Sequence, residues 1–92
     1  MKISKIEDNK KRYMSLLFLA DEQEDMIDRY LEKGTMYVLE ENGVKAECVV
    51  TDEGNRVLEI KNIAVLPECQ RMGYGKRMIE FIEQIYLSLI HI

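Results

Sequence analysis

The residues best suited to chemistry lie together in one short segment, Gln70-Arg71-Met72-Gly73-Tyr74-Gly75-Lys76-Arg77. Its charged members are all cations: Arg71, Lys76 and Arg77. Its two glycines allow the backbone to approach a ligand closely. An apolar run precedes the segment and a helical pattern follows it. The first turn of a helix has N–H groups without intrahelical partners and a partial positive charge. Together these features predict a site for a phosphorylated ligand, with a tight turn that binds nothing as the alternative.

Two widespread phosphate motifs do not fit this segment. A P-loop has the pattern G-x-x-x-x-G-K-[ST], whereas here Gly75-Lys76 is followed by Arg77 and position 70 is glutamine. A dinucleotide fingerprint has the pattern G-x-G-x-x-G, and Met78 occupies the place of its third glycine. The two glycines alone are therefore weak evidence for a ligand.

The hydrophobic pattern before the segment predicts an α+β domain, whose first elements are a strand and two helices. A short strand over residues 1–6 is followed by a helix over residues 10–20, in which apolar side chains recur at helical spacing. A second helix is expected after Asp21, which together with Glu24 resembles a capping box. This helix is expected to end with Gly34 in the left-handed conformation.

Three strands are then predicted to form an antiparallel meander. The predicted strands are residues 36–39, 44–51 and 57–66. Asn42-Gly43 is a strong hairpin signal because both turn residues must take positive φ, and residues 52–55 predict the second turn. The segment with the two glycines then leads into a helix that is expected to end at about Tyr86.

The composition is that of one small globular domain. The chain has 92 residues, of which 47% are hydrophobic and 33% are charged. Its net charge of -4 argues against a nucleic-acid-binding surface, and its longest uncharged apolar stretch, Met14 to Ala20, is too short to span a membrane. Cys48 and Cys69 lack metal-ligand spacing, and we expect them to be free thiols in a reducing compartment. We therefore expect a cytoplasmic protein that contains no metal and binds neither nucleic acid nor a membrane.

Residues 63–76 resemble the acetyl-CoA signature of the GNAT superfamily of N-acetyltransferases. That signature is Q/R-x-x-G-x-G/A after an apolar strand that ends in V-x-P. The matching residues are Val65, Pro67, Gln70, Gly73 and Gly75. The predicted order of elements is also similar to that family over residues 1–86. The resemblance implies a GNAT-like three-layer α/β arrangement, acetyl-CoA as cosubstrate, and direct transfer of an acetyl group to a primary amine.

The resemblance also implies which residues bind the cosubstrate. Backbone groups of Ile63, Ala64 and Val65 would pair with the pantetheine arm as an added strand does. The N–H groups that would surround the pyrophosphate belong to Arg71, Met72, Gly73, Tyr74, Gly75 and Lys76. Gln70 would assist from its side chain or its backbone. The side chains of Arg71 and Lys76 either contact the ligand or are merely solvated.

Acetyl transfer requires a proton acceptor for the amine and a donor to the thioester oxygen. Glu59, six positions before Val65, resembles the general base of histone-type members, and its alternative is an outward-facing glutamate paired with Lys61. The N–H of Val65, or of a neighbour at a strand bulge, is the expected donor. Asn62 and Tyr37 are further candidates for contact with the amine, or ordinary residues of the sheet.

The sequence departs from the family after the signature helix. A complete GNAT domain continues with a fifth strand, which splays from the fourth to hold pantetheine, and with later elements that supply an acid and part of the acceptor pocket. Residues 87–92 lack the amphipathic pattern of the residues before them; their sequence is Leu87-Ser88-Leu89-Ile90-His91-Ile92. They match one translated reading frame of a transposon end that is used in sequencing libraries. We expect a native portion over residues 1–86 and a non-native tail over 87–92, with a genuine helix end as the alternative.

An unpaired fourth strand leads to the last expectations. We expect impaired catalysis, and self-association through the exposed strand edge. The alternative function is a non-catalytic α+β module that binds CoA or forms dimers, and a third is an interaction domain without a ligand. The expected partners are acetyl-CoA and an amine acceptor that the sequence does not identify.

Overall fold

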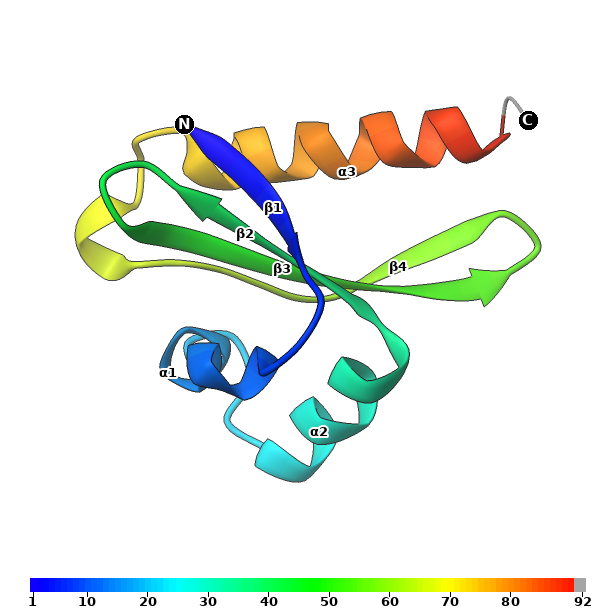
Figure 1. Ribbon diagram of the computed structural model, residues 1–92, viewed down its shortest axis with the longest axis horizontal. Coiled ribbons are helices and arrows are strands. Elements are labelled where there is room, and N and C mark those ends of the chain that lie inside the picture. Colours follow the sequence, from blue (N-terminus) through cyan, green and yellow to red (C-terminus); the bar gives the residue numbers. More distant parts are fainter. Residues whose placement is uncertain (91–92) are drawn as a thin grey trace.

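Strands of this protein form one antiparallel sheet with helices on both faces (Figure 1). The computed structural model describes residues 1–90, with side chains described through residue 87. The elements in chain order are β1 (Lys2–Ile6), a 3-10 helix (Lys10–Tyr13), α1 (Met14–Leu17), α2 (Glu24–Lys33), β2 (Thr35–Glu40), β3 (Val44–Gly54), β4 (Val57–Val65), a second 3-10 helix (Pro67–Cys69) and α3 (Tyr74–Ile90). The α+β class and the predicted order of elements are confirmed.

The sheet has the order β1-β2-β3-β4, and every neighbouring pair is antiparallel. The predicted three-strand meander is therefore confirmed, with β1 added beside β2. Within the described residues β4 pairs with β3 on one side and has no strand on the other. The segment with the two glycines follows the C-terminal end of this edge strand.

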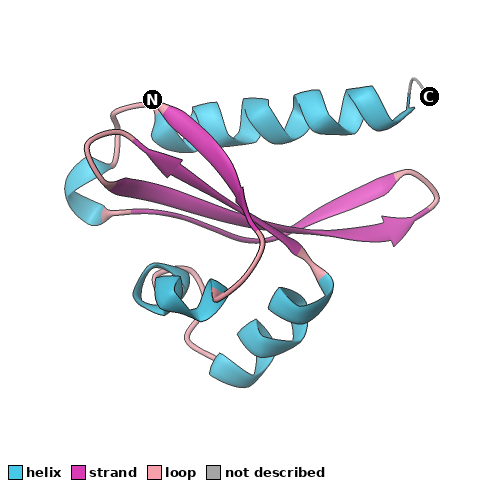
Figure 2. Cartoon of the chain, viewed as in Figure 1, coloured by secondary structure: helices cyan, strands magenta, loops and turns pink. Residues whose placement is uncertain are grey.

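Different helices cover the two faces of the sheet: α3 lies on one face, and α1 and α2 lie on the other (Figure 2). Because side chains alternate along a strand, Met36 and Val38 of β2 point toward α1 and α2, whereas Tyr37 and Leu39 point toward α3. We call these the α1/α2 face and the α3 face. The buried core of the α1/α2 face is Ile6, Leu17, Ile27, Tyr30, Leu31, Met36, Val38 and Val49. The buried core of the α3 face is Leu39, Ala46, Cys48, Val50, Cys69, Tyr74, Met78 and Ile82.

The first hairpin turn is as predicted and the second is displaced. Asn42 and Gly43 have φ of 55° and 100°. The second turn lies at Asn55 and Arg56, with φ of 53° and 64°, rather than over residues 52–55. Gly54 is still paired with Val57 beyond an irregularity in register, so β3 is longer than predicted. Two residues with positive φ match the twist of the strands that they join.

The predicted capping box of α2 is wrong. The N-cap is Gln23, not Asp21, and its side chain makes no capping hydrogen bond. The Asp21 carboxylate instead accepts the Gln23 backbone N–H at 3.0 Å and the Tyr30 hydroxyl at 3.1 Å. Asp21 therefore organises the loop that precedes the helix, two residues before the observed N-cap.

Gly34 ends α2 in an extended conformation, with φ −92° and ψ 176°, so the predicted left-handed cap is also wrong. A Cβ at this position would lie 2.6 Å from the Tyr30 carbonyl oxygen and 2.7 Å from that of Val50. Glycine is needed here because two backbones approach closely as the chain passes from α2 directly into β2.

Two helix boundaries differ from the predicted ones. The helix predicted over residues 10–20 is a 3-10 helix followed by the single turn of α1, and the N–H groups of Leu19 and Ala20 then bond the carbonyls three residues earlier. The helix predicted to end at about Tyr86 continues to Ile90. The proposed tail over residues 87–92 stays a prediction, and residues 91–92 lie outside the described residues.

Candidate functional site

The turn before α3 presents several backbone N–H groups to one side. Arg71 and Gly73 both have left-handed φ, of 66° and 87°. The first intrahelical bond of α3 runs from the Arg77 N–H to the Gly73 carbonyl at 3.0 Å. No carbonyl of the helix is therefore placed to accept from the N–H groups of Gly73, Tyr74, Gly75 and Lys76. Free N–H groups at the start of a helix are a typical site for anions.

The two glycines of the turn differ in what restricts them to glycine. Gly73 has open space around an added Cβ, and its φ of 87° is what disfavours other residues. Gly75 has no positive φ, and an added Cβ would lie 3.6 Å from Cγ2 of Val65, an ordinary contact. The packing of the chain itself therefore does not require glycine at position 75. Close approach of a ligand to the backbone would explain it.

The side chains of the turn divide into exposed cations and a buried tyrosine. Arg71, Lys76 and Arg77 are exposed and leave the turn locally positive. The Tyr74 ring is buried in the core of the α3 face, and its hydroxyl donates to Glu41 Oε1 at 3.3 Å. Tyr74 therefore has only its backbone to offer a ligand.

The outward peptide groups of β4 follow from its register with β3. The Leu66 N–H donates to the Lys45 carbonyl at 2.9 Å. In an antiparallel pair successive residues alternate between facing the partner strand and facing away. The peptide groups of Ala64 therefore face Glu47 of β3, and those of Ile63 and Val65 face the free edge. Of the three residues predicted to pair with pantetheine, two have their peptide groups on this edge.

Gln70 connects the turn to the end of this strand. Its side-chain Nε2 donates to the Val65 carbonyl oxygen at 3.3 Å, which is one of the outward peptide groups. The two groups of residues predicted to bind the cosubstrate are therefore adjacent in space, along the edge of β4 and across the start of α3.

Glu59 lies on β4 opposite Thr51, with its side chain 51% exposed. Lys61 Nζ donates to Glu59 Oε1 at 2.9 Å, and this hydrogen bond raises the pKa of Lys61. The predicted pairing with Lys61 is therefore present. Between them the register shifts, since Val50 pairs with Ile60 and Val49 with Asn62. Glu59 and Lys61 lie on the same side of the strand because they are two residues apart, and Lys61 is the extra residue of a bulge.

The other two candidates have structural contacts. Asn62 is buried and donates from Nδ2 to the Leu17 carbonyl at 3.0 Å and to the Tyr30 hydroxyl oxygen at 2.9 Å. It thereby joins β4 to α1 and α2. Tyr37 packs edge-to-face on Phe81, with ring centroids 5.3 Å apart, and belongs to the core of the α3 face.

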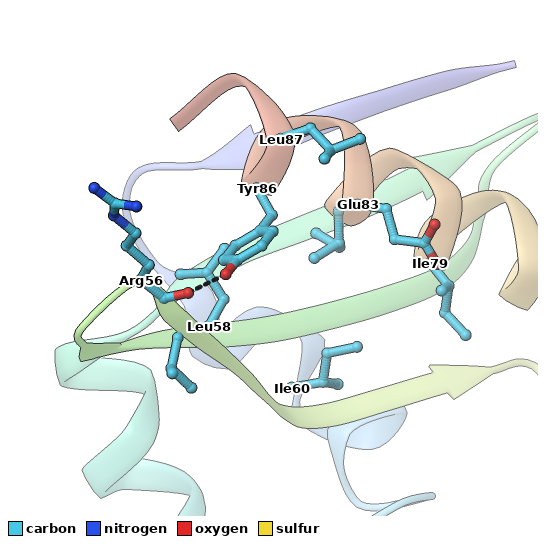
Figure 3. A pocket seen from close by; sticks show the side chains of 9 residues that line it. Arg56, Leu58, Ile60, Ile79, Glu83, Tyr86 and Leu87 are labelled. Carbon is cyan, nitrogen blue, oxygen red and sulfur yellow. Dashed lines mark hydrogen bonds between the residues drawn. The ribbon is translucent and has the colours of Figure 1, made fainter. Parts of the chain in front are cut away.

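Two grooves flank β4 away from the turn. An apolar groove of about 460 Å³ lies between the far half of β4 and the C-terminal half of α3, where the Tyr86 hydroxyl donates to the Arg56 carbonyl (Figure 3). A more polar groove of about 470 Å³ lies beside α2. Its lining residues are Asp21, Met26, Arg29, Tyr30, Lys33, Thr51, Asp52, Glu53 and Lys61.

Sequence reasoning missed one residue with unusual chemistry, Glu47. It is fully buried in the middle of β3, and burial raises the pKa of its carboxyl from 4.5 to about 8. Burial, together with Glu47, also raises the pKa of the neighbouring Cys48 thiol to about 12. The signal in the sequence was an acidic residue inside the otherwise apolar run from Ala46 to Val50.

Cys48 and Cys69 are free, as predicted, and both are buried. Within residues 1–90 no helix is long and apolar enough to cross a membrane. The described part of the chain contains no group of three or more His, Cys, Asp or Glu residues placed to hold a metal ion.

Comparison with known proteins identifies the family. The model of the acetyltransferase (GNAT) family matches residues 4–92. The uncharacterized N-acetyltransferase YvbK of Bacillus subtilis (strain 168) is 37% identical over 65 residues, which are 70% of this chain and 42% of that protein.

Solved structures show the same fold. A GNAT acetyltransferase of Elizabethkingia anophelis with acetyl-CoA bound superposes with a TM-score of 0.88 at 27% identity, over 95% of this chain and 57% of that one. A Bacillus subtilis acetyltransferase in complex with CoA superposes with a TM-score of 0.86 at 29% identity, over 96% of this chain and 59% of that one. An IAA acetyltransferase of Bacillus cereus ATCC 14579 superposes with a TM-score of 0.84 at 29% identity, over 96% of this chain and 60% of that one. The chain thus spans about three-fifths of the length of these structures, and it belongs to the GNAT acetyltransferase family.

Proposed function

We propose that this chain binds acetyl-CoA and supplies the cosubstrate half of an N-acetyltransferase. The observation that carries the proposal is the continuity of one backbone surface, from the outward peptide groups of Ile63 and Val65 to the N–H groups at the start of α3. Membership of the GNAT family supports it, as do the relatives described as complexes with acetyl-CoA and CoA.

Each part of the cosubstrate has a chemical counterpart along this surface. The pyrophosphate is an anion and fits the N–H groups from Arg71 to Lys76, with Gly75 allowing close approach. The pantetheine arm carries amides and fits the two outward peptide groups of β4, as an added strand would. Gln70 holds the end of the strand and the turn together.

The proposed reaction is a direct attack by a neutral primary amine on the thioester carbon. The new C–N bond forms, the C–S bond breaks, the thiolate leaves, and the amine gives up a proton to a base. Glu59 is the base that the resemblance implies, acting directly or through water. The outward N–H of Val65, or that of Ile63, which is two residues nearer to Glu59, donates to the developing oxyanion.

Three further parts of the proposal rest on the net charge of the chain, its free thiols and its length relative to the solved relatives. The chain has a net charge of -4, which attracts a cationic amine, while the locally positive turn attracts the phosphates. Two free thiols suit a reducing, cytoplasmic compartment. Reduced turnover of these 92 residues is also part of the proposal, because they span only about three-fifths of the solved relatives.

The experiment that tests the proposal is calorimetric titration of the chain with acetyl-CoA. We expect saturable binding to one site, lost in Gly73→Val because a β-branched residue resists the left-handed φ that aligns the N–H groups. Gly54→Val is the matched control, because Gly54 also has a left-handed φ, of 81°, and open space around an added Cβ, but lies at the end of β3 rather than in the turn. Absence of binding in the unsubstituted, folded chain would contradict the proposal.

A second candidate is a module that associates with another copy of this chain through β4. The free edge of this strand lies beside the apolar groove, where Ile60 is 41% exposed and Ile79 is 40% exposed. In an antiparallel pairing of two β4 strands centred on Ile60, Glu59 of each copy would oppose Lys61 of the other, so the charges are complementary. Sedimentation velocity across a range of concentrations tests it, and a strict monomer would exclude it.

A further inference from the structure

One buried side chain ties the start of α3 to the core of the protein. Among residues 71–77, all of which the structure describes, only Tyr74 has a buried side chain. Its ring is 8% exposed and lies in the core of the α3 face. The other residues with free N–H groups are Gly73 and Gly75, which have no side chain, and Lys76, whose side chain is exposed. The position of these N–H groups relative to the sheet therefore depends on how the Tyr74 side chain is held.

The Tyr74 hydroxyl is held by the hairpin that joins β2 and β3. It donates a hydrogen bond to Oε1 of Glu41 at 3.3 Å, across 33 residues of sequence. The hairpin and the start of α3 lie at the same end of the sheet (Figure 1). Burial raises the pKa of the Tyr74 phenol, and the Glu41 carboxylate raises it further, so the hydroxyl keeps its proton and remains a donor.

Glu41 is itself held by the hairpin turn. Its backbone N–H donates to the Gly43 carbonyl at 2.9 Å, and the turn residues Asn42 and Gly43 both have positive φ. Its second carboxylate oxygen, Oε2, lies 3.8 Å from the Met1 ammonium, which leaves Oε1 for the Tyr74 hydroxyl. The hairpin therefore supplies a fixed acceptor for the tyrosine.

Two side-chain hydrogen bonds bracket the turn before α3. On one side the Gln70 side chain donates to the Val65 carbonyl, and on the other the Tyr74 hydroxyl donates to the hairpin. Between these two contacts Arg71 and Gly73 have left-handed φ, and the side chains of the segment are exposed. Loss of the tyrosine contact would leave the start of the helix held by the ring alone.

The charge of Glu41 acts against the proposed ligand. A carboxylate beside the start of α3 repels phosphate, whereas the exposed cations Arg71, Lys76 and Arg77 attract it. If Glu41 acted through its charge alone, removing it would strengthen the binding of acetyl-CoA. If it acts through the Tyr74 hydroxyl, removing it weakens binding. The two effects have opposite signs, so an affinity measurement separates them.

We propose that Glu41 is a positioning residue for the cosubstrate: by accepting the Tyr74 hydroxyl, it fixes the orientation of the N–H groups that bind the pyrophosphate. This inference rests on the proposed function. Glu41 does not contact the ligand itself. The proposal gives the β2–β3 hairpin, which lies outside the family signature, a part in cosubstrate binding.

Calorimetric titration of two Glu41 variants with acetyl-CoA tests the proposal. Glu41→Ala should weaken binding by about twofold to tenfold, the value of one ordinary hydrogen bond. Glu41→Gln keeps an acceptor oxygen and loses the charge, so its affinity should equal or exceed that of the unsubstituted chain. The matched control is Glu40→Ala, which removes an exposed carboxylate from the preceding residue and should not weaken binding. Unchanged or tighter binding by Glu41→Ala would overturn the proposal.

A double-mutant cycle tests whether Glu41 acts through Tyr74. Tyr74→Phe keeps the ring and removes the hydroxyl, so it should weaken binding by a similar factor, and Glu41→Ala should then add no further loss. Losses that multiply in the double variant would contradict the proposal. Urea unfolding of the same chains identifies a merely structural contact, since Glu41→Ala would then lose stability and keep its affinity.

Amide chemical shifts of the chain without ligand separate this inference from the proposed function. Glu41→Ala should move the amide signals of Tyr74, Gly75 and Lys76, Glu41→Gln should restore them, and Glu40→Ala should leave them in place. Unmoved signals in Glu41→Ala would overturn the positioning role even if acetyl-CoA binds. If the signals move as expected but the unsubstituted chain does not bind acetyl-CoA, the proposed function fails and the positioning of the N–H groups by Glu41 is retained.

Discussion

The Gln70 side chain donates a hydrogen bond from Nε2 to the Val65 carbonyl oxygen at 3.3 Å. This contact joins the first residue of the family signature to the last residue of β4. It fixes where the backbone turns away from the sheet, and therefore how the N–H groups at the start of α3 lie relative to the outward peptide groups of the strand.

Replacing this glutamine tests that relationship. Gln70→Ala should weaken acetyl-CoA binding by about twofold to tenfold, the value of one ordinary hydrogen bond. The free energy of unfolding should change by less than about 0.5 kcal/mol, because the side chain is exposed. Calorimetry and urea unfolding check the two effects, with Gln84→Ala, an exposed glutamine of α3, as the control. Equal affinities of the two variants would show that the contact does not position the turn.

Substitutions of Gly75 should change the stability of the fold and the affinity for acetyl-CoA separately. Alanine at this place in the first turn of α3 makes an ordinary contact with Val65 and favours the helix by up to about 1 kcal/mol. Gly75→Leu should keep the fold, yet obstruct the approach of a pyrophosphate to the backbone. Urea unfolding with acetyl-CoA titration of both variants measures this, and undiminished binding by the leucine variant would show that the ligand does not approach Gly75.

Gly34→Ala should destabilise the fold by about 1–3 kcal/mol. The new Cβ would lie 2.6 Å and 2.7 Å from the carbonyl oxygens of Tyr30 and Val50, so the junction of α2 and β2 would have to shift. Urea unfolding measures the loss. A variant as stable as the unsubstituted chain would indicate that this junction adapts freely.

The pH dependence of stability should report on Glu47. Its pKa rises from 4.5 to about 8 on folding, so the folded state binds the proton more tightly than the unfolded state. The stabilisation is fully present below pH 4.5 and is lost as the pH rises toward 8. The slope is at most about 1.4 kcal/mol per pH unit. In Glu47→Gln this contribution disappears, and identical pH profiles of stability for the two chains would rule out a raised pKa.

Much of the fold could be predicted from local patterns, because they act through local backbone chemistry. The alternation along the strands, Asn42-Gly43 and the apolar face of α3 each led to the observed element. The conformation of Gly34 could not be predicted, since it depends on Val50, which is distant in sequence. The same holds for the cap of α2, where Asp21 is drawn into a loop by Tyr30.

The site could be predicted in part for a similar reason. The turn from Gln70 to Lys76 is continuous in sequence, so its pattern was visible. Which peptide groups of β4 face outward depends on pairing with β3, and the burial that raises the pKa of Glu47 depends on the packing of the whole fold. Those relationships exist only in the folded chain.

The most direct test of acetyl-CoA binding along the edge of β4 is amide hydrogen exchange, residue by residue, with and without the cosubstrate. Ala64 should be protected in both states, because its N–H faces β3. The amides of Ile63 and Val65, and those from Gly73 to Lys76, should gain protection only when acetyl-CoA is bound. If acetyl-CoA binds while Ile63 and Val65 exchange at unchanged rates, the cosubstrate does not lie along this edge, and the account is contradicted.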